Sequence, residues 1–325
     1  RGLTRLLSYA RDLETPVLLH VRTVKGKDYP PAEKNPDAFH GVSRFCIQTG
    51  EALQPSKPSF SGAFGAAMCA LAEQESRLCA ITAAMRDGTG LKEFSRCHPD
   101  RYFDVGIAEG HAVAMAAGMA KEGAVPVLAV YSSFLQRGYD MLLHDVGIQG
   151  LHVVFGVDRA GLVGEDGETH HGLFDVAYLA TVPGMTVLAP ASFAELRSML
   201  FHAVREEKGP VALRYPRGGE STYHSDHWGE KTVILEAGQG ITLVTYGTLT
   251  GEVLAAAERL RQDGYSPEVI KLNQIHPLDW KPVLASVTRT GRLLVAEECA
   301  AMGCVGERIA AGLAMAGLAP RAMAL

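Results

Sequence analysis

The chain has 325 residues, 47% of them hydrophobic, and its 31 basic and 36 acidic side chains give a net charge of −5. This length is enough for about two compact domains with hydrophobic cores of their own. The basic residues form no stripe or tail, and no apolar run reaches the roughly 18 residues that cross a bilayer. We therefore expect neither a nucleic acid nor a membrane as a partner.

Six cysteines are scattered along the chain without a CxxC pair: Cys46, Cys69, Cys79, Cys97, Cys299 and Cys304. This spacing does not indicate a cysteine metal site. Reduced thiols in a cytoplasmic protein are the simplest interpretation.

The two ends of the chain indicate part of a larger architecture. Arg1 is not an initiator methionine and opens no signal-peptide pattern. Residues 4–13 have the periodicity of an amphipathic helix and residues 16–21 that of a buried strand, so we expect the chain to begin inside a domain. Residues 316–325 follow a helical stretch without an obvious finishing strand, so we expect the last domain to be incomplete.

After residues 54–62, a stretch with the composition of a linker, apolar strands alternate with helices. The expected strands are 78–82, 102–107, 125–131, 151–158, 186–189 and 211–215, and the expected helices are 63–75, 111–121, 135–148, 174–181 and 193–207. This alternation predicts an α/β fold, a parallel sheet with helices on both faces. Ligands of such sheets bind beyond the carboxyl ends of the strands. The loops after Ile107, Tyr131, Asp158 and Tyr215 are therefore the candidate site.

A second polar stretch, residues 221–231, predicts another boundary. Beyond it, strands at 241–246, 268–272 and 292–297 and a helix at 251–263 predict a smaller α/β domain, also parallel. We therefore expect three parts. Residues 1–56 form the tail of one domain with a linker, residues 57–222 form the main domain, and residues 223–325 form the smaller one.

Glu109 stands where an apolar strand gives way to a helix of small residues, in FDVGIAEGHAVAMAAG. Small side chains let a cofactor approach closely. A partly desolvated carboxyl there can hydrogen-bond a ring nitrogen and shift a proton on the ring, as thiamine diphosphate requires. The alternative is an ordinary carboxylate favoured by the dipole at a helix start. Taken alone, this residue leaves both interpretations open.

Aromatic residues follow the next strand, in VYSSFLQRGYD. Tyr131 and Phe134 could stack on a flat ring. Arg137 lies three residues further on. The alternative is ordinary core packing with a solvated arginine.

A long polar loop, DRAGLVGEDGETHHG, follows the strand that ends at Asp158. It offers Arg159 for a substrate phosphate, the carboxylate of Asp166, and His170 for proton transfer. We also considered a metal site at His170 and His171, but adjacent loop histidines rarely point at one ion.

Two further segments carry candidate side chains. In LRYPRG, one of Arg214 and Arg217 could face a phosphate while the other pairs with a carboxylate, or both could be surface arginines. In KGKDYPPAEKNPDAFHGV, His40 stands among apolar neighbours, where a structural role is the commoner one.

Together and in this order, these segments resemble the 1-deoxy-D-xylulose-5-phosphate synthase family of the transketolase-like group. The blocks that carry the resemblance are KGKDYPPAEKNPDAFHGV, ITAAMRDGTGLKEFS, RYFDVGIAEGHAV, YSSFLQRGYDMLLHDV, VDRAGLVGEDGETHHGLFDVAYL, RYPRG and EECAAMGCVGE. The resemblance implies a thiamine-diphosphate-binding fold. It also implies the condensation of pyruvate with D-glyceraldehyde 3-phosphate, with loss of CO2, in isoprenoid, thiamine and pyridoxal synthesis.

The resemblance also implies roles for individual residues. Glu109, His40 and His170 match the family's catalytic residues. The cofactor-binding positions are Lys25, Tyr29, Glu109 and Phe134. The substrate-binding positions are Tyr131, Arg159, Asp166 and Arg217, with Arg159 and Arg217 on the phosphate side. Arg137 also matches a substrate-binding position.

The chain departs from the family pattern at three points. Gly110 stands where the family usually has Gln, which puts the local geometry in question, and His171 also replaces a usual Gln. The GDG segment and the following Asn that hold Mg²⁺ and the diphosphate in the family do not occur, so we expect no metal ligands in this chain.

By this resemblance the chain holds one wall of an active site and forms a homodimer. Two alternatives stay open. The chain could be one subunit of a split transketolase-like enzyme, or a non-catalytic truncated paralogue.

Overall fold

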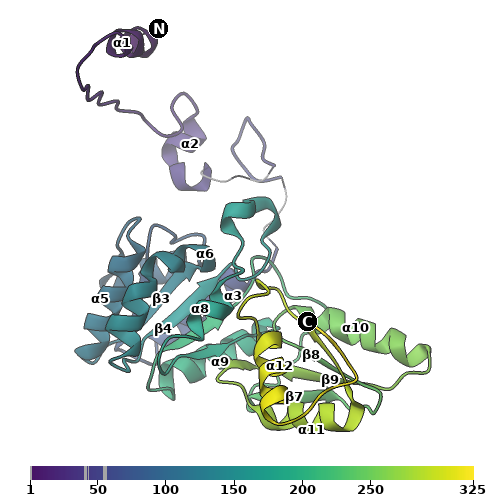
Figure 1. Ribbon diagram of the computed structural model, residues 1–325. Helices are drawn as coiled ribbons and strands as arrows, with labels where there is room; N and C mark the ends of the chain where they lie inside the picture. Colours follow the sequence, from purple (N-terminus) through teal and green to yellow (C-terminus); the bar gives the residue numbers. More distant parts are fainter. Residues whose placement is uncertain (1, 40–41, 43, 54–56) are drawn as a thin grey trace. The chain divides into compact units, whose positions relative to one another are not determined.

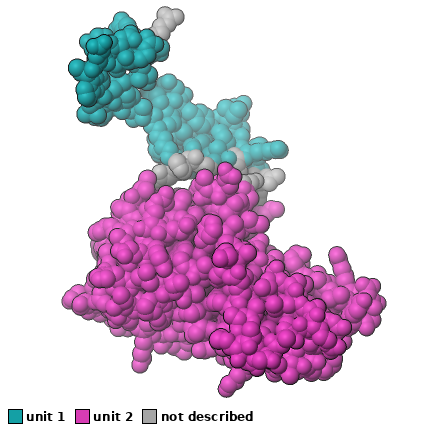
Figure 2. Space-filling view, viewed as in Figure 1, with its two compact units in different colours: residues 1–56 teal, residues 57–325 magenta. Residues whose placement is uncertain are grey.

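The computed structural model describes residues 2–39, 42, 44–53 and 57–325. It divides into two compact units, residues 1–56 and residues 57–325, which Figure 2 colours teal and magenta. No helix of the described part is long and apolar enough to cross a membrane.

The first unit has little secondary structure. It contains helices α1 (Gly2–Arg11) and α2 (Pro30–Lys34) and the 3-10 turn η1 (Pro36–Phe39). Tyr29 packs edge-on against Phe39, with ring centroids 5.5 Å apart, and its hydroxyl donates to the carbonyl of Ile47 at 2.9 Å. These contacts link Tyr29 with Phe39 and Ile47.

The expected strand at residues 16–21 is wrong, although the expected helix before it is present as α1. These residues have no regular secondary structure and pair with no described strand, and Leu18 is 96% exposed. An apolar run becomes a strand only where a neighbouring strand completes its hydrogen bonds, and the first unit provides none among its described residues.

The second unit begins with a seven-stranded sheet in the order β10-β5-β6-β4-β3-β1-β2. Figure 1 labels its neighbouring strands β3 and β4. Its strands are β1 (Leu78–Thr82), β2 (Tyr102–Asp104), β3 (Val125–Tyr131), β4 (Val154–Asp158), β5 (Thr186–Leu188), β6 (Val211–Arg214) and β10 (Gln274–His276). All pairs are parallel except β10 with β5. The predicted parallel sheet is thus confirmed, with an unexpected antiparallel edge strand.

Helices cover both faces of this sheet. Helices α3 (Phe60–Ala72), α4 (Lys92–Cys97) and α9 (Phe193–Arg205) share one apolar cluster with it, and α5 (Glu109–Lys121), α8 (Asp175–Leu179) and the segment after β3 share another. Serine side chains cap α3 and α9, since Ser59 accepts from the Gly62 N–H and Ser192 from the Glu195 N–H.

The expected helix at residues 135–148 is broken into short pieces. These are α6 (Ser132–Leu135), the 3-10 turn η3 (Gln136–Gly138), α7 (Tyr139–Met141) and the π-helical η4 (Leu142–Gly147). Gly138 lies so close to α5 that a Cβ there would come within 2.8 Å of a methyl group of Val113. This close approach brings the segment against α5 and places Arg137 near its first turn.

A second sheet has the order β12-β11-β8-β9-β7. Its strands are β7 (Thr232–Glu236), β8 (Ile241–Thr245), β9 (Pro267–Leu272), β11 (Arg292–Ala296) and β12 (Ala322–Ala324). It is not wholly parallel, because β7 runs antiparallel to β9, and β12 is a short strand that the sequence did not reveal. Helix α10 (Leu249–Gln262) covers one face, and α11 (Trp280–Thr290) and α12 (Val305–Met315) cover the other.

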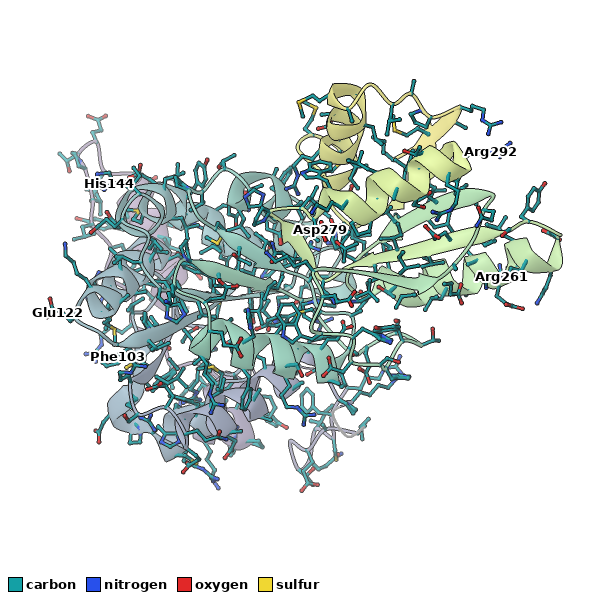
Figure 3. The ribbon with its side chains drawn as sticks, turned by 90° about the horizontal axis from the view of Figure 1, so that it is seen from below. Phe103, Glu122, His144, Arg261, Asp279 and Arg292 are labelled. Atoms are coloured by element: carbon teal, nitrogen blue, oxygen red, sulfur yellow. The ribbon has the colours of Figure 1, made fainter. Side chains whose placement is uncertain are left out.

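The two sheets share one core. The apolar cluster that lies under α5 continues through Val244 and Ile270 into α11 and α12. Strand β10 follows β9 along the chain, yet it pairs with β5, and the Ala189 N–H donates to the Asn273 carbonyl at 2.9 Å. Figure 3 shows Asp279, which caps α11, where the two sheets meet.

The packing of α3 against the loop before α4 leads to a prediction on stability. A Cβ at Gly65 would lie 2.0 Å from the carbonyl oxygen of Gly90. Gly65→Ala should therefore lower the free energy of unfolding by about 1–3 kcal/mol in urea titrations, because the backbone must move to make room. Gly62→Ala in the same helix is the control, since its nearest atom is the Ser59 Oγ at 3.4 Å. Equal unfolding midpoints for the two variants would contradict this prediction.

Candidate active site

The candidate site lies at the carboxyl ends of three neighbouring strands, β6, β4 and β3. Tyr131 is the last residue of β3, Arg159 directly follows β4, and Arg217 comes three residues after β6. Because adjacent parallel strands end at the same edge, these side chains meet there although they lie far apart in sequence.

An ion-pair network joins the loops after β4 and β6. The Arg159 Nε donates to Asp166 Oδ2 at 3.0 Å, and the Arg217 Nε lies 3.1 Å from the same oxygen. Asp166 belongs to the 3-10 turn η5 (Gly164–Asp166) in the loop that leaves β4. One carboxylate thus holds two arginines side by side, a pair with the charge and geometry to bind a phosphate group.

Tyr131 lies under the first of these arginines. The Arg159 guanidinium carbon is 3.7 Å from the centroid of the Tyr131 ring, a cation–π contact. Burial raises the pKa of the Tyr131 phenol. A Cβ added to Gly88 would lie 1.8 Å from the Tyr131 hydroxyl oxygen, so a larger residue there would have to displace the Tyr131 ring.

Aromatic rings connect this network with the start of α5. Phe134 lies 5.5 Å from the ring of Tyr131 and 5.1 Å from that of His170, measured between centroids. The Arg137 guanidinium is 5.2 Å from the Phe134 centroid, and its Nη1 is 3.7 Å from Glu109 Oε1. A continuous series of contacts therefore runs from Glu109 to Arg217.

Glu109 is the first residue of α5 and only 5% exposed, whereas the Arg137 side chain is 61% exposed. A buried carboxylate beside a half-buried phenyl ring fits a flat heteroaromatic ring with a nitrogen at its edge. Gly110 does not interrupt the helix, and a Cβ there would meet the Met141 side chain at 3.1 Å.

The two adjacent histidines have different surroundings. His171 Nδ1 accepts from the Val163 N–H at 3.0 Å and so braces the loop. His170, in the 3-10 turn η6 (Glu168–His170), faces Phe134, and its Nδ1 lies 3.0 Å from Thr169 Oγ1. In the part of the chain that the structure describes, no group of three or more His, Cys, Asp or Glu side chains is arranged to hold a metal ion.

Three predicted site residues belong to the first unit. Lys25 lies in an exposed turn, and Tyr29 packs in the aromatic group described above. His40 lies outside the described residues. Their roles stay predictions.

Asp158 is a candidate site residue that the sequence patterns did not single out. It is the last residue of β4 and fully buried, and its Oδ1 accepts from Arg159 Nη1 at 3.1 Å. Burial raises its pKa to about 6. The signal in the sequence was an acidic residue that closes an apolar strand directly before an arginine.

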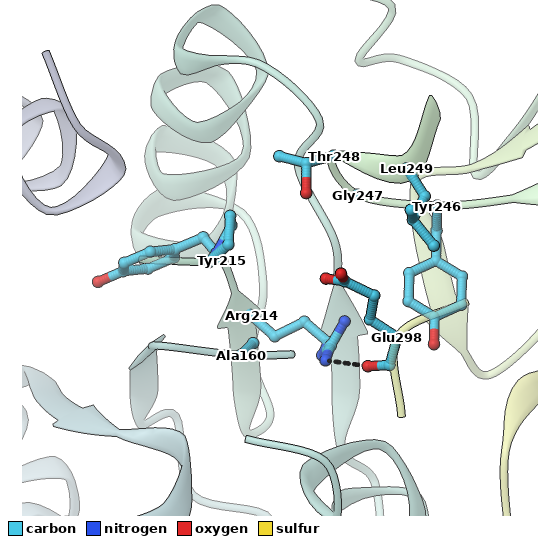
Figure 4. A pocket seen from close by; sticks show the side chains of 9 residues that line it. Ala160, Arg214, Tyr215, Tyr246, Gly247, Thr248, Leu249 and Glu298 are labelled. Atoms are coloured by element: carbon cyan, nitrogen blue, oxygen red, sulfur yellow. Dashed lines mark hydrogen bonds between the residues drawn. The ribbon is translucent and has the colours of Figure 1, made fainter. Parts of the chain in front are cut away.

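Of the two arginines in LRYPRG, Arg214 is the buried one. Its Nε donates to Asp175 Oδ2 at 2.8 Å and its Nη2 to the carbonyl oxygen of Glu298 at 3.3 Å (Figure 4). A small cavity beside this pair is lined by Arg214, Tyr246, Thr248 and Glu298, among others. Arg214 therefore joins the two sheets, and Arg217 is the arginine at the candidate site.

Two family models match the chain. "Transketolase, pyrimidine binding domain" matches residues 56–219, about half of the chain, and "Transketolase, C-terminal domain" matches residues 230–322. The fold, the site at the strand ends and these matches define an α/β protein of the transketolase type.

Two curated relatives illustrate which proteins this chain resembles in sequence. The 1-deoxy-D-xylulose-5-phosphate synthase of Pelotomaculum thermopropionicum is 45% identical over 315 residues, which are 95% of this chain and 49% of that protein. The 1-deoxy-D-xylulose-5-phosphate synthase 1 of Geobacter sulfurreducens is 46% identical over 326 residues, which are 97% of this chain and 50% of that protein. The chain belongs to the transketolase family, and its sequence is similar to those of the curated 1-deoxy-D-xylulose-5-phosphate synthases. It spans about half the length of the curated relatives it matches.

Solved structures agree with this fold. A chain described as a split gene transketolase, inactive β4 tetramer, superposes with a TM-score of 0.74 at 26% identity, covering 82% of this chain and 88% of that one. A transketolase from Leishmania mexicana superposes with a TM-score of 0.65 at 17% identity, covering 77% of this chain and 40% of that one. This likeness shows a shared fold alone.

Proposed function

We propose that the chain forms the pyrimidine-side wall of a thiamine-diphosphate-dependent synthase that condenses pyruvate with D-glyceraldehyde 3-phosphate to 1-deoxy-D-xylulose 5-phosphate, with loss of CO2. The observation that carries the proposal is the series of contacts from the buried carboxylate of Glu109 to the arginine pair Arg159 and Arg217. It combines a group able to exchange a proton with a cofactor ring and a group able to bind a phosphate.

Glu109 and Phe134 are the residues we assign to the aminopyrimidine ring. Thiamine diphosphate, when bound, supplies the carbanion chemistry that the condensation needs. Glu109 holds a proton against a ring nitrogen, and Phe134 stacks on the ring face. Lys25, Tyr29 and His40 belong to the proposal by resemblance alone.

The arginine pair is assigned to the substrate phosphate. Arg159 and Arg217 share Asp166, which fixes their spacing, and Tyr131 supports Arg159 from below the guanidinium plane. Arg137 is placed beside Glu109, where it can meet a substrate carboxylate, and His170 can transfer a proton next to Phe134.

The diphosphate and its Mg²⁺ are assigned to residues outside this chain. We propose that a diphosphate-binding half completes the site, that the enzyme is a homodimer, and that it works in the cytoplasm. We also propose that the functional parts of the chain are residues 1–56, 57–222 and 223–325, which the two matched domains support.

The test is an assay of the chain together with its diphosphate-binding half, supplied with thiamine diphosphate, Mg²⁺, pyruvate and D-glyceraldehyde 3-phosphate. We expect 1-deoxy-D-xylulose 5-phosphate and one CO2 for each pyruvate consumed. A completed enzyme that releases no product would overturn the proposal.

A second candidate is one subunit of a split transketolase-like enzyme. The observation that favours it is the coverage of 88% of a chain from a split gene transketolase, against about half of the curated relatives. Co-purification of this chain with a partner of ~30–35 kDa, a size typical of two domains, would support it. Calorimetry that finds no thiamine diphosphate binding even beside that partner would instead favour a non-catalytic paralogue.

A further inference from the structure

Arg159 adopts a backbone conformation that residues other than glycine rarely adopt. Its φ is +60°, in the left-handed region that crowds a Cβ. Such a conformation persists only where the surroundings over-determine it. Here the side chain is 12% exposed, stacks on Tyr131, and donates from Nη1 to the Gly88 carbonyl oxygen at 3.0 Å.

Asp158 is the residue directly before it, and both of its carboxylate oxygens have partners. Oδ1 accepts from Arg159 Nη1 at 3.1 Å, and Oδ2 accepts from the hydroxyl of Ser61 in α3 at 2.7 Å. Ser61 thus anchors the carboxylate to a helix on one face of the sheet. The Arg159 Nε is taken by Asp166, and the described residues offer no partner to Nη2, which is left for a ligand.

We propose that Asp158 is a positioning residue of this site, whose buried carboxylate, anchored by Ser61, fixes the guanidinium of Arg159 for binding an anionic substrate group. The fixed Arg159 in turn orients Asp166, and through it Arg217. Only the identity of the anion, a phosphate ester, rests on the proposed function. The dependence of Arg159 on Asp158 does not.

The charge of Asp158 changes in an accessible pH range. Burial raises its pKa to about 6, although Arg159 and the Ser61 hydrogen bond both act to lower it. The other titratable groups that face it are the phenols of Tyr131 on β3 and of Tyr215, which directly follows β6. Burial raises the pKa of both phenols, so they stay neutral near pH 6. Asp158 therefore releases Arg159 when it takes up a proton as the pH falls below about 6.

The raised pKa of Asp158 also predicts how the stability of the fold depends on pH. The folded state holds the Asp158 proton more tightly than the unfolded state, so this group stabilises the fold below its unfolded pKa and loses that contribution as pH rises through about 6. At neutral pH, Asp158→Asn should therefore be at least as stable as the wild type. A merely structural carboxylate would give a less stable variant.

The test measures this contact directly, by the ¹⁵N NMR signal of the Arg159 Nη1 group, which donates to Asp158 Oδ1. We expect a slowly exchanging signal in the wild type at neutral pH, lost on acidification with a midpoint of about 6, and absent from Asp158→Asn at every pH. Inorganic phosphate, as the probe, should bind Asp158→Asn about tenfold more weakly. In the completed enzyme, the same variant should raise KM for the aldehyde phosphate more than it lowers kcat.

Ser61→Ala is the second variant and keeps the native carboxylate. Because the lost hydrogen bond lowers the pKa of Asp158, its removal should move the midpoint to higher pH and leave the signal intact in alkaline solution. Histidines in general change charge near neutral pH, so His170→Gln is the control and should leave the midpoint in place.

An Arg159 signal that persists in Asp158→Asn, or a midpoint that Ser61→Ala does not move, would overturn the inference. An Arg159 signal that depends on Asp158 in a protein that binds no phosphate would support the inference and count against the proposed function.

Discussion

Replacing Glu109 by glutamine should lower the turnover of the completed synthase by a factor of about 100 to 10,000, the range that a positioned acid–base group supplies. Glutamine keeps the size and one hydrogen-bonding oxygen of the side chain but cannot exchange a proton. Glu109 is 5% exposed at the first turn of α5, so water cannot easily replace it. The measurement is kcat at saturating substrates and cofactor.

The control is Glu122→Gln at the other end of the same helix. Glu122 follows α5 as its C-cap and is exposed, so this variant should retain wild-type turnover (Figure 3). A Glu109→Gln enzyme that works within a factor of about two of the wild type would contradict the role of Glu109, since a lost acid–base group costs far more.

Replacing Lys271 by methionine should lower the free energy of unfolding by about 3–5 kcal/mol, because it leaves a buried carboxylate without its cation. Lys271 is the second-last residue of β9, and its Nζ lies 2.9 Å from Glu195 Oε2 of α9, with both side chains fully buried. The Tyr223 hydroxyl donates to the other oxygen of Glu195 at 2.9 Å. This network joins the two sheets, so the loss should appear in urea unfolding of the whole second unit.

The double variant Lys271→Met/Glu195→Gln separates the charge from the packing. A neutral amide at position 195 keeps an oxygen for Tyr223 but no longer needs a cation, so most of the lost stability should return. Arg96→Met, which breaks an exposed ion pair with Glu93, should change little. A double variant no more stable than Lys271→Met alone would show that the cost lies in packing.

Strands buried on both faces were predictable because their sequence is apolar throughout. The structure has β1 and β3 at the predicted bounds. The remaining strands of the first sheet, except β10, fall within the predicted ranges. Strand β10 could not be foreseen, since its three residues pair with β5, from Gln274 with Leu188 to His276 with Val187, far away along the chain, and no local pattern encodes that choice.

The predictions of a continuous helix at residues 135–148 and of a strand at residues 16–21 were wrong for a related reason. Periodicity predicts which residues can form an element, but neighbours decide whether they do. Around Gly138, where the chain contacts α5, the hydrogen bonding changes between α-helical, 3-10 and π-helical segments. Residues 16–21 have no strand to pair with among the described residues of the first unit.

The sequence by itself determined the alternation of strands and helices, the loops that carry the candidate site, and the family, because these depend on local composition and on motifs in a fixed order. Only the tertiary structure decided that Asp166 holds both Arg159 and Arg217, and that Asp158 connects Arg159 with Ser61. Asp158, Arg159 and Asp166 belong to the end of β4 and its loop, but Arg217 follows β6 and Ser61 belongs to α3, both distant from that loop along the chain. Their geometry follows from packing, which no single segment specifies.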